Sequence, residues 1–290
     1  MLTTKLDTVM HHCLALREAY EAGILHRDFS VGNIIIDSEG QGWLIDWDLS
    51  KPVSSPAASE TPRRAARTVS NDLLSAIIKA SSEYISQGTW QFLSANLINN
   101  PDAQHNFRDD LESSIYVLIW VTLMYSEVSN QRQVKPFLSN ILDPKSYDFV
   151  AGFARQDFLK GQSFLQHVKF PGRPALHSLI CNLADLFRFR YLPEPSNQLR
   201  QEYEVLHQLV LAGPVNEAMK VAYRKDPYRL HIEAMANLSG HTATIKFFNA
   251  ALSDRNNWPT DDLPKDQAHR RLNDPIVKSH WRSTRVQATV

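Results

Sequence analysis

Residues 22–37 read AGILHRDFSVGNIIID, and this stretch decides how the rest of the sequence is interpreted. A His-Arg-Asp tripeptide ends at Asp28, and Asn33 follows five residues later, at the start of a short branched apolar run. A second apolar run, GWLIDW at 42–47, comes after a turn-forming segment and contains Asp46. Two such runs around a short turn predict a β-hairpin. The hairpin would carry Asp28 and Asn33 at its entrance and Asp46 at its exit.

Two aspartates and an asparagine at this spacing suit phosphoryl transfer, which depends mainly on positioning and charge neutralisation. Asp28 is the candidate base for the attacking hydroxyl. Asn33 and Asp46 are candidate magnesium ligands, because Mg²⁺ prefers oxygen donors. A lone His-Arg-Asp can arise by chance, but the joint pattern of helix, tripeptide, asparagine, hairpin and second aspartate favours a phosphotransfer site. His26 is expected to pack and hydrogen-bond rather than to titrate.

Composition and charge narrow the class of protein. The chain is 43% apolar and 21% charged, and 31 basic residues balance 31 acidic ones, so bulk charge points to neither nucleic acid nor a membrane surface. Cys13 and Cys181 lie too far apart for a metal motif, and no disulfide framework is expected. The amino terminus lacks a signal-peptide pattern, and the longest apolar run, 115–124, is about half the length of a spanning helix. We expect a soluble intracellular protein of the cytoplasm or nucleus, of undetermined oligomeric state.

Apolar periodicity predicts a mainly α chain, with the hairpin of residues 33–46 as its only substantial β structure. The segment 110–125 is apolar nearly all round, which is typical of a buried central helix. An irregular loop with at most one short helix is expected between residues 51 and 87. The other helices are expected at 4–22, 176–187, 199–211, 214–225 and 240–252.

Several motifs in the same order resemble the carboxy-terminal lobe of eukaryotic protein kinases, and specifically the fungal-type protein kinase family. They are HRDFSVGNIII, GWLIDWDLSKP, GTWQFLSANLI at 88–98, HNFRDDLESSIYVLIW at 105–120, and the stretch 237–262 with its Trp-Pro end. The resemblance implies a kinase-like C-lobe over residues 1–262, without the β-sheet of an N-lobe. It also implies an activation segment over 46–98 and a polar, disordered tail over 263–290.

The resemblance further implies an ATP- and Mg²⁺-dependent protein kinase that phosphorylates Ser or Thr of a protein substrate. Asp28 would be the base, and Thr89 would contact it. Arg27 would read a phosphorylated or acidic activation loop. Asp110 would brace the backbone of the catalytic loop, and His26 would support that loop. The two magnesium ligands would also hold the ATP phosphates.

Four positions depart from the family pattern. Trp47 and Asp48 stand where Phe-Gly usually follows the metal aspartate. Ser30 replaces a lysine that would contact the γ-phosphate. Asn96 replaces a glutamate that would pair with an arginine late in the lobe, so that ion pair is expected to be absent.

Two other functions remain open. A small-molecule kinase of the aminoglycoside or choline type also ends its metal strand in Ile-Asp-Trp, but it lacks an activation segment. A non-catalytic remnant or scaffold is the second alternative, because the sequence contains no G-x-G-x-x-G loop and no strand lysine before the His-Arg-Asp motif. We therefore expect this chain alone to bind Mg-ATP weakly at best. Its phosphate transfer is expected to be no faster than that of Asp28→Asn or Asp46→Asn.

Residues 69–87 interrupt an otherwise continuous activation-segment pattern. Val69-Ser70 and Gln87 are residues that intron borders can encode, so the segment is either a translated intron or a genuine insertion that forms a short amphipathic helix.

Overall fold

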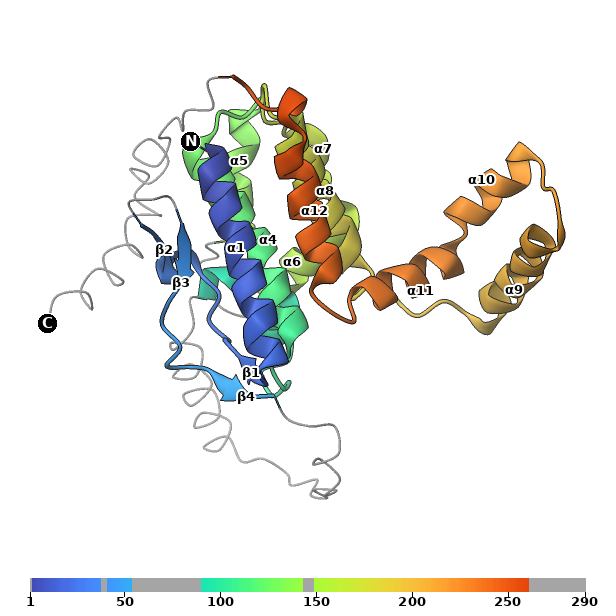
Figure 1. Cartoon of the computed structure of the whole chain (residues 1–290), viewed down its shortest axis with the longest axis horizontal. Coiled ribbons are helices and arrows are strands. Elements are labelled where there is room, and N and C mark those ends of the chain that lie inside the picture. The colour runs from blue at the N-terminus through green and yellow to red at the C-terminus, as the bar shows by residue number, and fades with distance from the viewer. Residues whose placement is uncertain (1, 38–40, 54–89, 143–148, 261–290) are drawn as a thin grey trace, which may run out of the picture.

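The computed structural model describes residues 2–37, 41–53, 90–142 and 149–260, which form a helical lobe and a helical arm (Figure 1). Helix α4, Phe107–Tyr125, runs through the middle of the lobe and is buried along almost its whole length. A capping box between Asn106 and Asp109 starts it. A helix that is apolar on all sides needs neighbours on all sides. The mainly α architecture with a buried central helix is confirmed.

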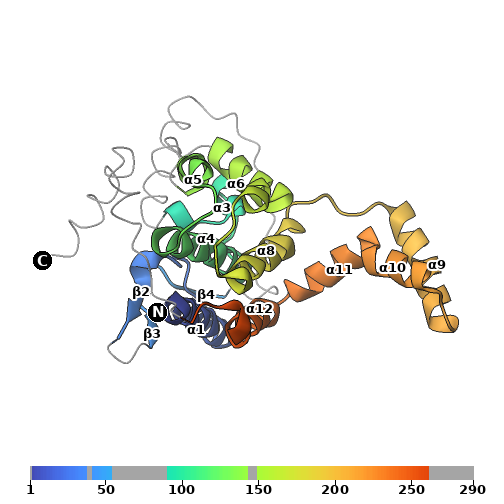
Figure 2. The ribbon, with the colours of Figure 1, turned by 90° about the horizontal axis from the view of Figure 1, so that it is seen from above.

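The helices around α4 come from both ends of the chain. Helix α1, Leu2–Glu21, contacts α4 and also α12, Thr242–Ser253, and α12 in turn packs on α8, Pro174–Arg188. Figure 2 shows α1 and α12 side by side along one flank of this group. On the other flank, the short α3, Ala95–Asn99, packs on α6, Phe149–Gly161. The remaining lobe elements are η1 (Val31–Asn33), η3 (Trp90–Phe92), α5 (Gln131–Phe137), η4 (Leu138–Leu142), α7 (Ser163–His167) and η5 (Arg255–Asn257).

Three helices form an arm that extends away from the lobe (Figure 1). They are α9 (Asn197–Ala212), α10 (Glu217–Lys225) and α11 (Pro227–Asn237). Stacked rings of Tyr203, His207 and Tyr223 join α9 to α10, and His207 Nδ1 lies 2.7 Å from the Tyr223 hydroxyl. Helix α9 buries no residue, so the arm is held by this aromatic contact rather than by a core of its own.

The expected hairpin consists of β2, Ile34–Ile36, and β3, Gly42–Leu44, paired antiparallel with Ile35 opposite Trp43. It lies against α1. A Cβ on Gly42 would stand 2.9 Å from His12 Cε1 and 3.1 Å from Thr8 Cα, and still closer to Thr8 Cγ2. Only glycine therefore allows this approach of β3 to the helix.

A second antiparallel pair was not expected from the sequence. Strand β1, Ile24–Leu25, pairs with β4, Lys51–Pro52. Two-residue strands are too short to show an alternating pattern. Their pairing closes the loop that contains the His-Arg-Asp tripeptide and the hairpin, so both ends of the candidate site are tied together.

Some predictions fall outside the described residues: Thr89, the segment 69–87 and the tail 263–290. No helix within the described ranges is both long enough and apolar enough to cross a bilayer.

Candidate active site

Asp28 and Asn33 are in direct contact. The Asn33 side chain is buried, and its Nδ2 donates to Asp28 Oδ2 at 3.0 Å and to the Asp28 carbonyl at 2.8 Å. The turn of η1 between the two residues brings them together. Because the amide nitrogen is engaged by Asp28, the Asn33 oxygen is the atom that the amide presents to a cation.

Asp46 reaches this pair through the backbone of its neighbour Ile45. The Ile45 N–H donates to the Asn33 carbonyl at 2.9 Å, and the Ile45 carbonyl accepts from His26 Nε2 at 3.0 Å. The peptide before Asp46 is thus held from both sides. The Asp46 side chain is exposed. That Asp46 and Asn33 share one metal ion stays a prediction.

The His26 side chain packs inside the lobe. Its side chain is fully buried, and its ring meets Trp47 edge to face at 4.5 Å between centroids. Its Nδ1 accepts from the Asp28 N–H at 3.2 Å, while Nε2 donates to Ile45. These two bonds fit the tautomer with its proton on Nε2, and they link the loop before the hairpin to the strand after it.

Asp110 contacts the same loop from the start of α4. Its Oδ2 accepts from the Arg27 N–H at 3.3 Å, and its Oδ1 lies 2.8 Å from His105 Nε2. The Arg27 guanidinium donates to the Leu49 carbonyl at 3.4 Å, in the segment that follows Asp46. The central helix and the segment after Asp46 therefore both bond to Arg27.

Arg27 and Asp46 adopt left-handed backbone conformations, with φ of 73° and 62°. A non-glycine residue there is strained by about 1 kcal/mol or more, and such strain is retained where the surroundings impose it. Both residues flank the Asp28–Asn33 pair. Two of the three non-glycine residues with positive φ in the described ranges thus lie where the chemistry was expected, and the third, Gln162, precedes α7.

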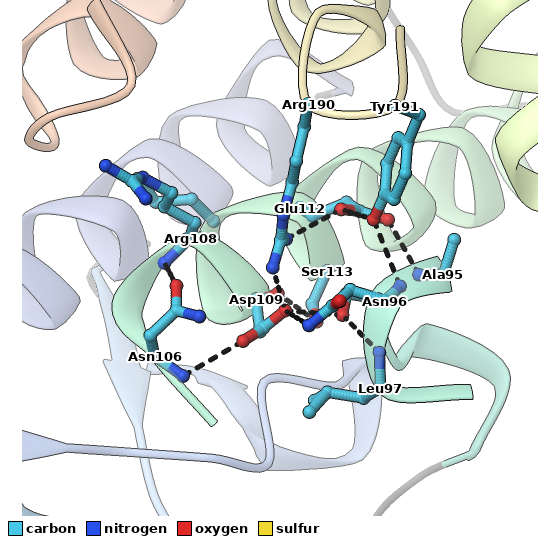
Figure 3. Close-up of polar contacts among 12 residues, drawn as sticks. Ala95, Asn96, Leu97, Asn106, Arg108, Asp109, Glu112, Ser113, Arg190 and Tyr191 are labelled. Carbon is cyan, nitrogen blue, oxygen red and sulfur yellow. Dashed lines mark hydrogen bonds and ion pairs between the residues drawn. The ribbon is translucent and has the colours of Figure 1, made fainter. Parts of the chain in front are cut away.

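A buried ionic network beneath this site was missed by sequence reasoning (Figure 3). Arg190 donates to Glu112 Oε2 at 2.9 Å and to Asp109 Oδ1 at 2.5 Å, and both carboxylate side chains are fully buried. Asn96 lies at the edge of this network, with its Nδ2 3.5 Å from Asp109 Oδ1. The only sequence signal was the acidic run at the start of α4, which reads as an ordinary helix start.

Glu112 also holds the backbone of α3. It accepts from the Ala95 N–H at 2.8 Å, from the Tyr116 hydroxyl at 3.0 Å and from the Tyr191 hydroxyl at 2.5 Å. Burial raises the pKa of Glu112, although Arg190 opposes the shift. These three donors and the Arg190 guanidinium together supply the hydrogen bonds and the countercharge that the buried Glu112 carboxylate requires.

Comparison with known families finds a match over the part of the chain that contains the candidate site. Residues 4–122 match the family described as Fungal protein kinase. This part of the chain is thus similar to fungal protein kinases. The match contains Asp28, Asn33 and Asp46 and extends through most of α4, so the helical lobe is kinase-like. Searches of curated proteins and of solved structures found no match.

The family match supports a kinase-like phosphotransferase function for this lobe. Within the described ranges, no cluster of three His, Cys, Asp or Glu side chains could hold a metal ion. The predicted ligands of the kinase lobe are one amide and one carboxylate oxygen. Such a set suits Mg²⁺, which keeps several waters and takes further oxygens from phosphate.

Proposed function

We propose that this lobe is the catalytic lobe of an ATP- and Mg²⁺-dependent protein kinase that phosphorylates Ser or Thr of a protein substrate. The bond from Asn33 Nδ2 to Asp28 Oδ2 carries the proposal, because it orients a base and a metal ligand with one contact. Phosphoryl transfer needs groups held in place more than it needs covalent chemistry.

Each of the chain's own groups has one task in this proposal. The Asp28 carboxylate accepts the proton of the attacking hydroxyl. The Asn33 oxygen and the Asp46 carboxylate hold the Mg²⁺ that neutralises charge on the phosphates. Arg27 and Asp110 hold the backbone of the loop, so that Asp28 keeps its direction as the proton moves.

An apolar face beside these groups supports a nucleotide as the phosphate donor. Ile35 and Trp43 lie opposite each other in the hairpin and are 46% and 56% exposed. Ile45, two residues after Trp43, is also exposed. Directly opposed residues share a face of a hairpin, and Ile45 follows the end of β3 directly. Such an exposed apolar surface, next to the proposed metal ligands, suits a purine ring.

The proposal is tested first by locating a metal–nucleotide complex. Mn²⁺ with ATP is added to the chain, and paramagnetic broadening of backbone amide signals is measured by NMR. Weak binding is expected, with a dissociation constant of about 1 mM or higher. Broadening should centre on residues 28–33 and 45–47. Asp46→Asn should abolish it, whereas the matched control Asp48→Asn, an exposed acid two residues away, should not.

The assay separates the proposal from its alternatives. Asp28→Asn should still bind Mn-ATP, because the base is not a proposed ligand. Broadening elsewhere, or broadening that survives Asp46→Asn, contradicts the proposed site and favours a scaffold. Radiolabelled ATP then measures transfer to a serine- and threonine-containing protein. Transfer by the wild type that both Asp28→Asn and Asp46→Asn remove would support the kinase and would show that this chain alone suffices.

A further inference from the structure

Helix α9 of the arm carries apolar side chains on two opposite sides. On one side, Tyr203 and His207 stack on the Tyr223 ring of α10. The other side presents Val205 and Leu209, which are 64% and 52% exposed and which we call the outer stripe. These two residues lie about one helical turn apart and nearly opposite the stacked rings. A helix that is apolar on two sides needs a neighbour on each, and in the described part of the chain only the ring side is covered.

The outer stripe offers no charge of its own to a partner. Helix α9 has three charged residues, Arg200, Glu202 and Glu204, and all of them lie in its first half. Arg200 Nε pairs with Glu204 at 2.9 Å, and Gln198 Nε2 donates to Glu202 at 2.9 Å. The second half of the helix contains no acidic or basic residue besides histidine. A charged surface would lose hydration on this stripe without gaining a countercharge, so the stripe suits a partner that is itself apolar and uncharged.

The electrostatics of α9 make the same helix of a second copy a suitable partner. The first turn of α9 contains no acidic residue and the last turn no basic one, so no side chain compensates the partial charges at its ends. An antiparallel copy would bring the positive end of each helix to the negative end of the other. It would also place the charged half of each helix against the uncharged half of its partner. Because the chain has no net charge, two copies do not repel each other as a whole.

We propose that two copies of this chain associate through the outer stripe, with their α9 helices packed antiparallel about a two-fold axis. Such an axis makes the interface isologous, so the same stripe serves both copies. With the axis near His207, Val205 of each copy faces Leu209 of the other, and both stripes are covered. The two Glu202 carboxylates then lie about 15 Å apart along the helices and do not oppose each other. This proposal does not depend on the proposed kinase function.

Association through α9 leaves the candidate active site accessible. Helix α9 lies at the far end of the arm, whereas the hairpin of β2 and β3 lies on the opposite side of the lobe (Figures 1 and 2). Two lobes would thus be joined through their arms without covering Asp28 or Asn33. A single pair of helices buries a small area, so the dimer is expected to be weak, with a dissociation constant of about 10 µM.

Analytical ultracentrifugation of the full chain, over about 1–100 µM, measures this association. Leu209→Glu should weaken it at least about tenfold, because it places a carboxylate in each apolar contact. The matched control is Leu211→Glu. Leu211 is 67% exposed on the same helix, but it points away from the outer stripe, so association should not change. Circular dichroism checks that both variants keep the helix content of the wild type.

A mixing experiment tests the antiparallel register. A mixture of Leu209→Glu and Val205→Lys should regain association that neither variant shows alone, because position 209 of one copy faces position 205 of the other. Recovery only when Leu209→Glu is mixed with Leu209→Lys would indicate parallel helices and overturn the proposed geometry.

Three results would overturn the interface itself. They are a wild type that stays monomeric over the whole range, including one that binds a different protein through the stripe, association that survives Leu209→Glu, and equal weakening by Leu209→Glu and Leu211→Glu. Should Leu209→Glu not fold, Leu209→Gln decides by the same measurements.

Discussion

Arg190 Nη1 donates to Glu112 Oε2 at 2.9 Å and thereby ties the end of α8 to the buried start of α4, 78 residues earlier in the chain. The same carboxylate accepts from the backbone of α3. The Glu112 carboxylate thus joins three segments, the residues after α8, the start of α4 and the start of α3 (Figure 3).

Replacing Arg190 should destabilise the lobe severely. Arg190→Met leaves Asp109 and Glu112 buried without their cation, and such a loss costs about 3–5 kcal/mol. The free energy of unfolding is measured by urea denaturation. The control is Arg200→Met, which removes an exposed i,i+4 pair with Glu204 and should leave the free energy of unfolding nearly unchanged. Equal losses for the two variants would contradict the central role of the buried network.

Gly42→Ala should displace the hairpin from α1. The new methyl group would overlap Thr8 and His12, and forced overpacking costs about 1–3 kcal/mol. Gly161→Ala is the control, because no atom lies within 4 Å of its added Cβ. Thermal unfolding compares the two variants. A Gly42→Ala protein as stable as Gly161→Ala would mean that β3 does not need its close approach to the helix.

The stability of the lobe should fall in acid through His241. Burial, assisted by Arg17, lowers the pKa of His241 from 6.5 to about 4, and Asp110 only partly opposes this. Between these two values the unfolded chain binds the proton more readily than the folded one. Stability is therefore expected to decrease as the pH falls from 6.5 toward 4.

His241→Phe should reduce that loss, because phenylalanine can occupy the site beside Tyr20 and Phe107 without titrating. Urea denaturation at several pH values in this window measures the effect. His167→Phe, at an exposed position, should leave the pH dependence as it is in the wild type. An unchanged pH profile in His241→Phe would refute the assignment.

The two cysteines should differ in reactivity. Burial raises the pKa of Cys13 to about 12, and burial also raises the pKa of the half-buried Cys181. Because the thiolate is the nucleophile, iodoacetamide at pH 8 should alkylate Cys181 first. Cys13 should react about a thousandfold more slowly than an unburied thiol. Mass spectrometry follows both sites, and in urea their rates should converge. Rapid native labelling of Cys13 would show that α1 is not packed as described.

Local sequence signals located the hairpin and the helices α1, α4, α8, α9, α10 and α12, because their periodicity and turns arise from neighbouring residues. Helix α6 was not predicted. The expected central helix of 110–125 begins a few residues earlier, at Phe107, where the side chain of Asn106 caps it. Helix α11 was missed because it starts at Pro227, directly after α10, and helix-period signals merge across such a boundary.

The order of motifs in the sequence was also enough to indicate a kinase-like lobe and to select Asp28, Asn33 and Asp46. A spacing of five residues across a turn brings Asp28 and Asn33 together almost by chain geometry alone. Asp46 is brought near this pair by the register of the hairpin, in which the Ile45 N–H bonds to the Asn33 carbonyl.

Only the tertiary structure decided which distant partners complete the lobe. Asp109 and Glu112 read as exposed acids at a helix start, and nothing local marks Arg190 as their cation. Arg155 likewise reads as a surface arginine of a helix, yet it is buried on the carbonyls of residues 90–93. Every residue has a backbone carbonyl, so the sequence does not show which carbonyls will accept a hydrogen bond from a buried arginine. The charge of a side chain likewise does not identify its partner in the folded protein. Burial and pairing arise when segments far apart in the chain pack together, which is why local patterns could not predict them.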